Sequence, residues 1–291
     1  MRRVWPRHFP GPTLVGMATQ MRKLLWEAHN ELRIHPVRKW VRARAGDRTV
    51  VDSHRVLLVW EPRRVVGSYA VPVEDVAGEL VAADAVAGEA HPISLEEGPP
   101  VLDPSTSFAV HSTDGSPLTI RTADGDLAGA AFRADDPDLA GYVVLDWQAF
   151  TQWYEEDEPV VAHPHDPFDR IDCLRSSRHV EISHNGIVLA DTTRSTLLFE
   201  TPLPTRFYLP REDVAMHLLE PTATHTVCAY KGQASYWSAR VGDDVLADIA
   251  WSYPEPLNDA TPVRDLIAFL TERLDLVVDG EPQPRPRTPW S

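Results

Sequence analysis

The chain has 291 residues, of which 43% are hydrophobic, so it can bury one large core or two smaller ones. Its 43 acidic and 28 basic residues give a formal net charge of −15, which repels phosphate backbones and anionic lipid, so we expect neither nucleic acid nor a membrane as a partner. No long apolar run occurs, and none follows the basic N-terminus, so neither a membrane span nor a signal peptide is expected. Cys173 and Cys228 form no CxxC pair, which favours a reducing, cytoplasmic location.

Residues 1–34 are expected to form a leader and one short helix. Residues 1–16 are rich in Pro, Gly and Arg. Between residues 17 and 32 the apolar spacing predicts an amphipathic helix that His35-Pro36 ends. This helix would lie across the first domain.

Strands predominate in the pattern from residue 35 to residue 162. The strand periodicity covers 41–45, 49–51, 56–60, 107–111, 118–122, 127–132 and 160–162, and Asp124-Gly125 is a strong hairpin signal. Short helices are predicted at 72–80, which opens with Pro and carboxylates, and at 147–153, which Asp146 can cap. Residues 82–104 are predicted to form a long surface loop, and 163–174 a linker.

The same order of elements recurs after Ile171. Aligning Tyr69 with Tyr208 also pairs Val41 with Val180, Asp52 with Asp191 and Glu61 with Glu200, and beyond the long loop Arg121, Asp124 and Phe150 meet Arg240, Asp243 and Phe269. We therefore predict a tandem duplication, with a degenerate first repeat at 35–162, a second repeat at 175–282 and a Pro-rich tail at 283–291. Each repeat would be mainly β (α+β), a small antiparallel fold with two short helices.

Local signals are clearer in the second repeat. Asn185-Gly186 and Gly242-Asp243 predict hairpins. Thr261-Pro262 predicts the start of a helix that runs to about Leu270, and residues 276–278 are predicted to return to the sheet.

Several motifs carry a resemblance to a known family. They are Val56-Leu-Leu-Val-Trp-Glu61, Tyr208-Leu-Pro-Arg-Glu-Asp-Val214, Leu219-Glu-Pro221, Cys228-Ala-Tyr-Lys-Gly232, Ser235-Tyr-Trp-Ser238 and Ala250-Trp-Ser-Tyr-Pro-Glu-Pro256. Over residues 38–162 and 175–282 the chain resembles the bacterial domain-of-unknown-function 427 family. The resemblance implies two tandem β-tent-like domains, related in shape to methionine sulfoxide reductase B and the ligand-binding domain of cereblon. It implies no established activity, although a nucleotidyltransferase-like label is sometimes attached to the family.

The functional site is expected where the two repeats differ. Opposite Tyr236-Trp237-Ser238 the first repeat has Pro117-Leu118-Thr119, and opposite Tyr230 and Trp251 it has His111 and Phe132. Identities that both repeats share, such as Glu61 and Glu200, are interpreted first as scaffold. The unshared run from Cys228 to Arg240 is therefore the better candidate.

Aromatic side chains of the second repeat can form either the walls of a small-molecule pocket or ordinary sheet core. Tyr236 and Trp237 must point to opposite faces of their strand, so only one of them can line the pocket. The ligand-binding residues that we expect are Tyr208, Tyr230, Lys231, Trp237, Trp251, Tyr253 and Arg206.

Three reactive side chains of this region have more than one interpretation. Lys231 precedes Gly232 in a tight turn, where a lysine normally projects into water; alternatively it lies at the pocket mouth near Glu200, as an anion-binding or acid–base group. Cys228 is either a small buried hydrophobe or a nucleophile beside a cation, and no histidine has the signature of its base. Glu200 and Arg206 would supply orienting charge.

We expect neither a metal nor a cofactor. His163-Pro-His165-Asp166 has the tightest spacing of possible ligands but lies in the Pro-rich linker, and zinc-binding proteins of the β-tent type use cysteine pairs that this chain lacks. Gly115-Ser116 followed by Asp124-Gly-Asp126 imitates the magnesium site of a nucleotidyltransferase, but the hairpin already explains Asp124-Gly125.

The leading hypothesis is an aromatic-lined small-molecule pocket in the second repeat. One alternative is an enzyme that uses Cys228 or Lys231, including a nucleotidyltransferase-like activity. Another is an interaction module whose exposed aromatic side chains contact a protein. No pattern in the sequence indicates an oligomeric state.

Overall fold

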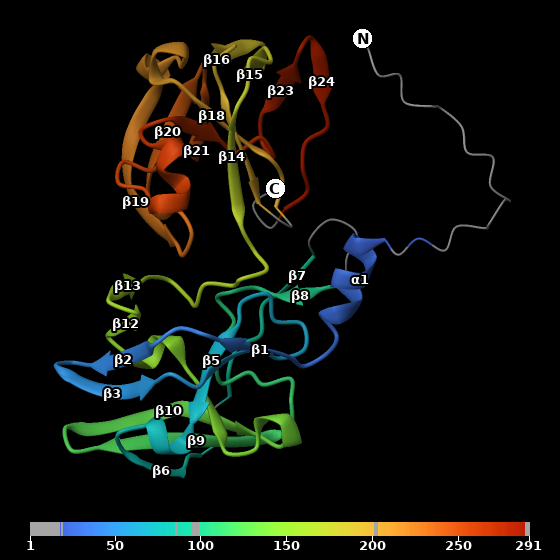
Figure 1. The fold of residues 1–291 in the computed structure, drawn as a ribbon. Helices are drawn as coiled ribbons and strands as arrows, with labels where there is room; N and C mark the ends of the chain where they lie inside the picture. The colour runs from blue at the N-terminus through green and yellow to red at the C-terminus, as the bar shows by residue number, and fades with distance from the viewer. Residues whose placement is uncertain (1–17, 19, 85–86, 95–98, 201–202, 289–291) are drawn as a thin grey trace, which may run out of the picture.

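Antiparallel β-sheets make up most of the protein. The computed structural model describes residues 18, 20–84, 87–94, 99–200 and 203–288. Figure 1 shows two groups of sheets, one coloured blue to green and the other yellow to red. The mainly β fold class predicted from the sequence is confirmed.

The first half of the chain contains a seven-stranded sheet and a four-stranded sheet. In spatial order the larger sheet comprises β1 (Arg33–Val37), β4 (Val56–Trp60), β5 (Ser68–Pro72), β11 (Tyr142–Leu145), β10 (Gly125–Ala134), β9 (Gly115–Thr122) and β6 (Glu79–Ala82). The smaller sheet comprises β13 (Glu158–Val160), β12 (Gln152–Glu155), β2 (Val41–Ala45) and β3 (Arg48–Ser53). A short pair, β7 (Pro92–Ile93) and β8 (Val101–Leu102), and the helix α1 (Met21–Ala28) accompany them.

The second half contains the same two kinds of sheet. Its larger sheet has the order β14 (Ile171–Arg175), β17 (Thr196–Glu200), β18 (Arg206–Leu209), β22 (Ile267–Phe269), β21 (Asp244–Ser252), β20 (Gly232–Val241) and β19 (Leu219–Cys228). Its smaller sheet has the order β16 (Ile187–Thr192), β15 (Val180–His184), β23 (Asp275–Val278) and β24 (Glu281–Gln283). With β7 and β8 left out, the strands of the two halves correspond one to one along the chain and in both sheets.

Hairpin turns occur where glycine and asparagine predict them. Gly125 and Gly242 have positive φ, and β9–β10 and β20–β21 pair directly across their turns. At Asn185 and Gly186 both residues have positive φ, 50° and 78°, as a two-residue turn with the right-handed twist of the strands requires.

Three predicted helices are wrong. In place of α-helices at 72–80 and 147–153 the structure has the short 3₁₀ helices η1 (Val73–Asp75) and η3 (Trp147–Ala149). As predicted, Asp146 caps the second of these, since its side chain accepts a hydrogen bond from Gln148 N. The helix predicted at 262–270 is replaced by η6 (Asn258–Val263) and then β22. In each case strand pairing of the following apolar residues overrides the local helical pattern. The other 3₁₀ helices are η2 (Pro137–Leu139), η4 (Arg211–Asp213) and η5 (Met216–Leu218).

Several predicted boundaries also shift. His35-Pro36 lies within β1 instead of ending the helix, and residues 107–111 are irregular instead of a strand. The segment 163–174, predicted as a linker, already contains most of β14, which pairs with β17. The predicted tail at 283–291 overlaps β24, and the predicted loop at 82–104 contains β7 and β8.

Each larger sheet has one face packed against the smaller sheet of its half. In the second half the core between the two sheets includes Ile182 of the smaller sheet and Leu209, Ile249 and Phe269 of the larger sheet. The opposite face carries a second cluster of buried side chains, which contains Tyr208, Tyr230, Trp251 and Tyr253. This second cluster, referred to below as the aromatic cluster, forms the surroundings of the candidate site. None of the helices in the described part of the chain has the length and apolar character that a bilayer crossing requires.

Candidate functional site

Lys231 lies in the turn between β19 and β20 and is directed into the protein. The hairpin ends at the pair Cys228 and Gly232, so residues 229–231 form the turn. Gly232 has a φ of 92°, and a Cβ at this position would lie 3.2 Å from the carbonyl oxygen of Glu255. Glycine therefore allows the turn to fold onto the segment that follows β21, where Leu257 N donates to the Lys231 carbonyl oxygen. As a result Lys231 is only 8% exposed.

The ammonium group of Lys231 donates a hydrogen bond to the carboxylate of Glu200, the last residue of β17. Of the two interpretations of Lys231 that the sequence leaves open, the structure agrees with the one near Glu200 and not with the one that projects into water. Burial lowers the pKa of Lys231, but the Glu200 carboxylate and the Cys228 side chain outweigh it and raise the pKa above its ordinary value. Lys231 is therefore a buried, charged donor to Glu200, and the Cys228 side chain helps to raise its pKa.

The aromatic cluster lies near this ion pair, since the charge of Glu200 helps to raise the pKa of both Tyr208 and Tyr253. Tyr208 and Trp251 are the strand partners of Ala268 on either side of β22, so their rings meet across a small residue. The rings are perpendicular, with centroids 6.3 Å apart, and Trp251 Nε1 donates to Tyr208 Oη at 3.1 Å. Tyr253 follows Trp251 on the same face, and its ring centroid lies 6.5 Å from that of Tyr208. Burial raises the pKa of Tyr208, Tyr230 and Tyr253 far above the ordinary value, so these phenols remain neutral hydrogen-bond donors.

Trp237 lies apart from this cluster. As the alternation of β20 requires, Tyr236 and Trp237 point to opposite faces. Trp237 packs against the core on the other face, where the Arg211 guanidinium lies 5.4 Å from its ring centroid. Tyr236 is the member of the pair that lies beside Trp251, with ring centroids 6.4 Å apart. The structure thus brings together Tyr208, Tyr230, Trp251 and Tyr253, and places Tyr236 where we expected Trp237.

Arg206 is engaged by a buried partner that the sequence did not indicate. Its guanidinium donates two hydrogen bonds to Glu272, at 2.8 and 2.7 Å, and lies 5.5 Å from the ring centroid of Trp251. Burial raises the pKa of Glu272, but the hydrogen bonds and charge of Arg206 outweigh it and hold that pKa below the ordinary value. Arg206 therefore supports the wall formed by Trp251. Arg206 and Glu272 are 66 positions apart, and no local motif connects them.

The segment between the two halves covers the turn at 229–231. The His165 ring stacks on that of Tyr230, with centroids 5.4 Å apart, and its Nε2 donates to the Ala229 carbonyl oxygen at 2.6 Å. Asp166 N donates to Tyr230 Oη at 3.0 Å. These contacts hold the predicted linker against the candidate site.

Asp169, in the same segment, is a functional candidate that sequence reasoning missed. Its Oδ1 is buried and has no hydrogen-bond partner among the described residues. Burial, together with the negative charges of Glu200 and Asp166, raises the pKa of Asp169 to about 7, although Lys231 opposes this shift. Asp169 is therefore a carboxyl group that gains or loses a proton near neutral pH beside a fixed ion pair. The only signal was its position two residues before β14.

The comparisons with known proteins agree with the family resemblance in this part of the chain. Residues 172–280 match the family model described as "Domain of unknown function (DUF427)". The second half thus carries a DUF427 domain. No curated protein matches the chain. The matched residues include β14, β17 and both strands of the Lys231 hairpin, whereas Asp169 lies just outside the DUF427 domain.

Both thiols of the protein border the aromatic cluster of the DUF427 domain. Cys173 and Cys228 are free, and Cys173 Sγ donates to the Asp259 carbonyl oxygen at 3.7 Å. Burial and the neighbouring Asp172 raise the pKa of Cys173, so its thiol stays protonated. Cys228 is one of the groups that raise the pKa of Lys231.

The other candidate motifs have different surroundings. In the part of the chain that the structure describes, no three His, Cys, Asp or Glu side chains converge as metal ligands would. Asp124 lies at its hairpin, where Arg48 binds it and lowers its pKa, and Asp126 faces Arg121 at 3.6 Å.

Proposed function

We propose that the DUF427 domain binds a small polar organic molecule at the pair Lys231–Glu200, between walls formed by Tyr208, Trp251 and Tyr253. The single observation that carries this proposal is the buried, unpartnered carboxyl oxygen of Asp169 beside the ion pair. Buried polar atoms of folded proteins nearly always have a hydrogen-bond partner, so an unpartnered one beside a charged pair favours a position that a ligand fills.

Hydrogen-bonding capacity that the protein does not use defines the chemistry of the ligand. An ammonium has three N–H groups, and one of those of Lys231 serves Glu200, which leaves donors for a ligand. Asp169 offers a carboxyl that accepts when ionised and donates when protonated. A ligand with a carbonyl or hydroxyl oxygen for Lys231 and a second polar group for Asp169, carried on an apolar frame, matches both.

The proposal includes the two-repeat organisation predicted from the sequence. The matching strand orders and the aligned residues support a first repeat at 35–162 and a second at 175–282, which β14 extends to Ile171. Only the second would hold the ligand. The two free thiols support a reducing compartment such as the cytoplasm.

A thermal-shift screen against a broad metabolite library tests the proposal. We expect at least one compound to raise the melting temperature of the parent protein by several degrees, because ligand that binds only the folded state stabilises it. The shift should persist in Lys23→Met, which removes the lysine of an exposed Lys–Glu pair in the first half, and vanish in Lys231→Met. If no compound stabilises the parent, or if both variants respond alike, the proposal is wrong.

The electrostatic coupling between Lys231 and Cys228, which borders the aromatic cluster, favours a second candidate, an enzyme in which Cys228 attacks an electrophilic substrate. Iodoacetamide labelling followed by mass spectrometry distinguishes it. A nucleophilic Cys228 would be alkylated much faster than Cys173 and would slow down in Lys231→Met, whereas equal slow labelling of both thiols would count against catalysis. The buried state of the aromatic cluster gives no support to an interaction module with exposed aromatic side chains.

A further inference from the structure

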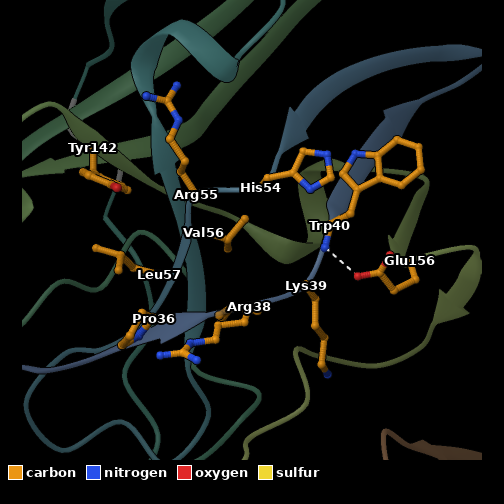
Figure 2. A pocket seen from close by; sticks show the side chains of 11 residues that line it. Pro36, Arg38, Lys39, Trp40, His54, Arg55, Val56, Leu57, Tyr142 and Glu156 are labelled. Atoms are coloured by element: carbon orange, nitrogen blue, oxygen red, sulfur yellow. Dashed lines mark hydrogen bonds between the residues drawn. The ribbon is translucent and has the colours of Figure 1, made fainter.

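A hollow of about 420 Å³ lies on the surface of the first half, remote in sequence from the DUF427 domain. Its lining comes from the connection between β1 and β2, from the turn before β4, from β4 itself and from β11. Figure 2 shows the stacked rings of Trp40 and His54 on one side, Tyr142 on the other, and Val56 and Leu57 between them. The volume falls within the range of pockets that hold small molecules.

Trp40 is held rigidly at the edge of this hollow. Its Nε1 donates to Asp52 Oδ1 at 2.7 Å, and its backbone N donates to Glu156 Oε1 at 2.9 Å. The Arg42 guanidinium lies 3.7 Å from the Trp40 ring centroid, and the His54 ring stacks at 5.5 Å with an interplanar angle of 17°. This arrangement offers a preorganised aromatic platform at the protein surface.

The hollow has positively charged donors in a protein whose net charge is −15. Arg55 is engaged by Glu74 and Asp75, and Lys39 by Glu155. Arg38 lines the hollow, is exposed, and has no carboxylate or hydrogen-bond partner in the described part of the chain. A free guanidinium is suited to bidentate recognition of a carboxylate or phosphate.

The second half retains the hydrogen bonds that hold Trp40 in place, but it lacks the side chains that would face a ligand in this hollow. His179 N donates to Asp279 Oδ1 at 2.9 Å, and His179 Nε2 lies 2.7 Å from Asp191 Oδ1, which reproduces the two contacts of Trp40. Yet the aligned positions hold His179 for Trp40, Thr193 for His54 and Ser177 for Arg38. The common scaffold therefore does not require the ring pair or the free arginine.

We propose that this hollow is a second ligand site, separate from the one at Lys231, and that it takes an organic anion with a planar ring. The ring packs between the Trp40–His54 stack and Tyr142, over Val56 and Leu57. The anionic group binds Arg38 at the rim. Aromatic carboxylates and mononucleotides share this chemistry.

Calorimetric titration of the full chain tests the site with four probes. Adenosine 5′-monophosphate and indole-3-acetate each carry a ring and an anion, whereas adenosine lacks the anion and inorganic phosphate lacks the ring. We expect at least one of the first two to bind, and to bind at least about tenfold more tightly than adenosine or phosphate. Which of the two binds identifies the source of the anion.

Matched charge variants locate the binding. Arg38→Gln should lower the affinity for the probe that binds by about tenfold, because a charge-assisted hydrogen bond is lost. Arg133→Gln removes the same charge from an exposed arginine of the first half outside the hollow and should leave affinity unchanged. His54→Ala should weaken binding by about fivefold. Lys231→Met should have no effect, which separates this result from that for the DUF427 domain.

The proposal is overturned if neither anionic ring compound binds at millimolar concentration. It is also overturned if Arg38→Gln and Arg133→Gln bind the probe equally well.

Discussion

Glu61 and Glu200 occupy equivalent positions in the two halves but have different partners. Glu61 follows β4 and accepts hydrogen bonds from His111 Nδ1 at 2.9 Å and from the backbone amides of Ser112 and Thr113 at 2.8 and 3.2 Å. Glu200 ends β17 and is bound by the ammonium of Lys231. Both carboxylates are buried, so each requires compensation.

The difference shows how the same arrangement of strands can hold reactive side chains in one half and not in the other. In the first half the carboxylate is satisfied by backbone amides and by an imidazole that stacks on Phe132, with ring centroids 3.6 Å apart. In the second half a cation replaces these groups; Cys228 helps to raise the pKa of this cation, and the cation in turn influences the pKa of Asp169. Because the buried glutamate has a lysine in place of a histidine as its partner, the ammonium of Lys231, the thiol of Cys228 and the carboxyl of Asp169 influence one another near Glu200.

Removal of Lys231 should have the largest effect on stability. Lys231→Met leaves Glu200 buried without a counter-charge, which should lower the free energy of unfolding by about 3–5 kcal/mol, measured by urea denaturation. Lys23→Met is the control, because Lys23 and its partner Glu27 are 73% and 62% exposed, so the change should cost about 1 kcal/mol or less. Equal losses in the two variants would show that Glu200 is not uniquely dependent on its cation.

The corresponding change in the first half should cost less. In His111→Ala, Glu61 keeps both backbone amide donors, so we expect a loss of about 1–3 kcal/mol in the free energy of unfolding. His91→Ala serves as a control, since the ion pair of His91 with Glu89, at 4.0 Å, is exposed. A loss as large as that of Lys231→Met would remove the distinction between the two carboxylates.

The smallest expected effect is a pH dependence from Asp169. The folded protein retains the Asp169 proton up to about pH 7, while the ordinary value is 3.8, so the folded state binds more protons between these limits. The contribution of Asp169 to stability therefore falls as pH rises from 3.8 to about 7. Asp169→Asn removes this dependence, and its stability relative to the parent should rise across that window by on the order of 1 kcal/mol, because solvent screens part of the group.

Urea denaturation at a series of pH values measures the difference in the free energy of unfolding between Asp169→Asn and the parent protein. Asp243→Asn, at an exposed turn, should run parallel to the parent at every pH. A constant gap between Asp169→Asn and the parent would mean that Asp169 titrates alike in both states.

Features that depend on neighbouring residues were predictable from the sequence. The hairpins at Asp124-Gly125, Asn185-Gly186 and Gly242-Asp243 followed from turn residues that tolerate positive φ. The opposite faces of Tyr236 and Trp237 followed from the twofold period of a strand. The sequence left proximity of Lys231 to Glu200 as one of two interpretations, and the burial of Lys231 decided between them.

The choice between equivalent local patterns was made by tertiary structure. The apolar spacing at 262–270 suited a helix, but pairing with β18 and β21 draws Ile267–Phe269 into the sheet. Alternation placed one of Tyr236 and Trp237 beside the site without saying which, because that depends on the face that the smaller sheet covers.

The amino-acid sequence by itself determined a mainly β chain, the places of its turns and the run that holds Lys231. Only the tertiary structure decided the partners of the charged groups. Glu272 reaches Arg206 across 66 residues, and Asp169 reaches the ion pair because the segment before β14 folds back over Tyr230. Burial and charge pairing depend on contacts between segments distant in the chain, and local sequence patterns carry no information about them.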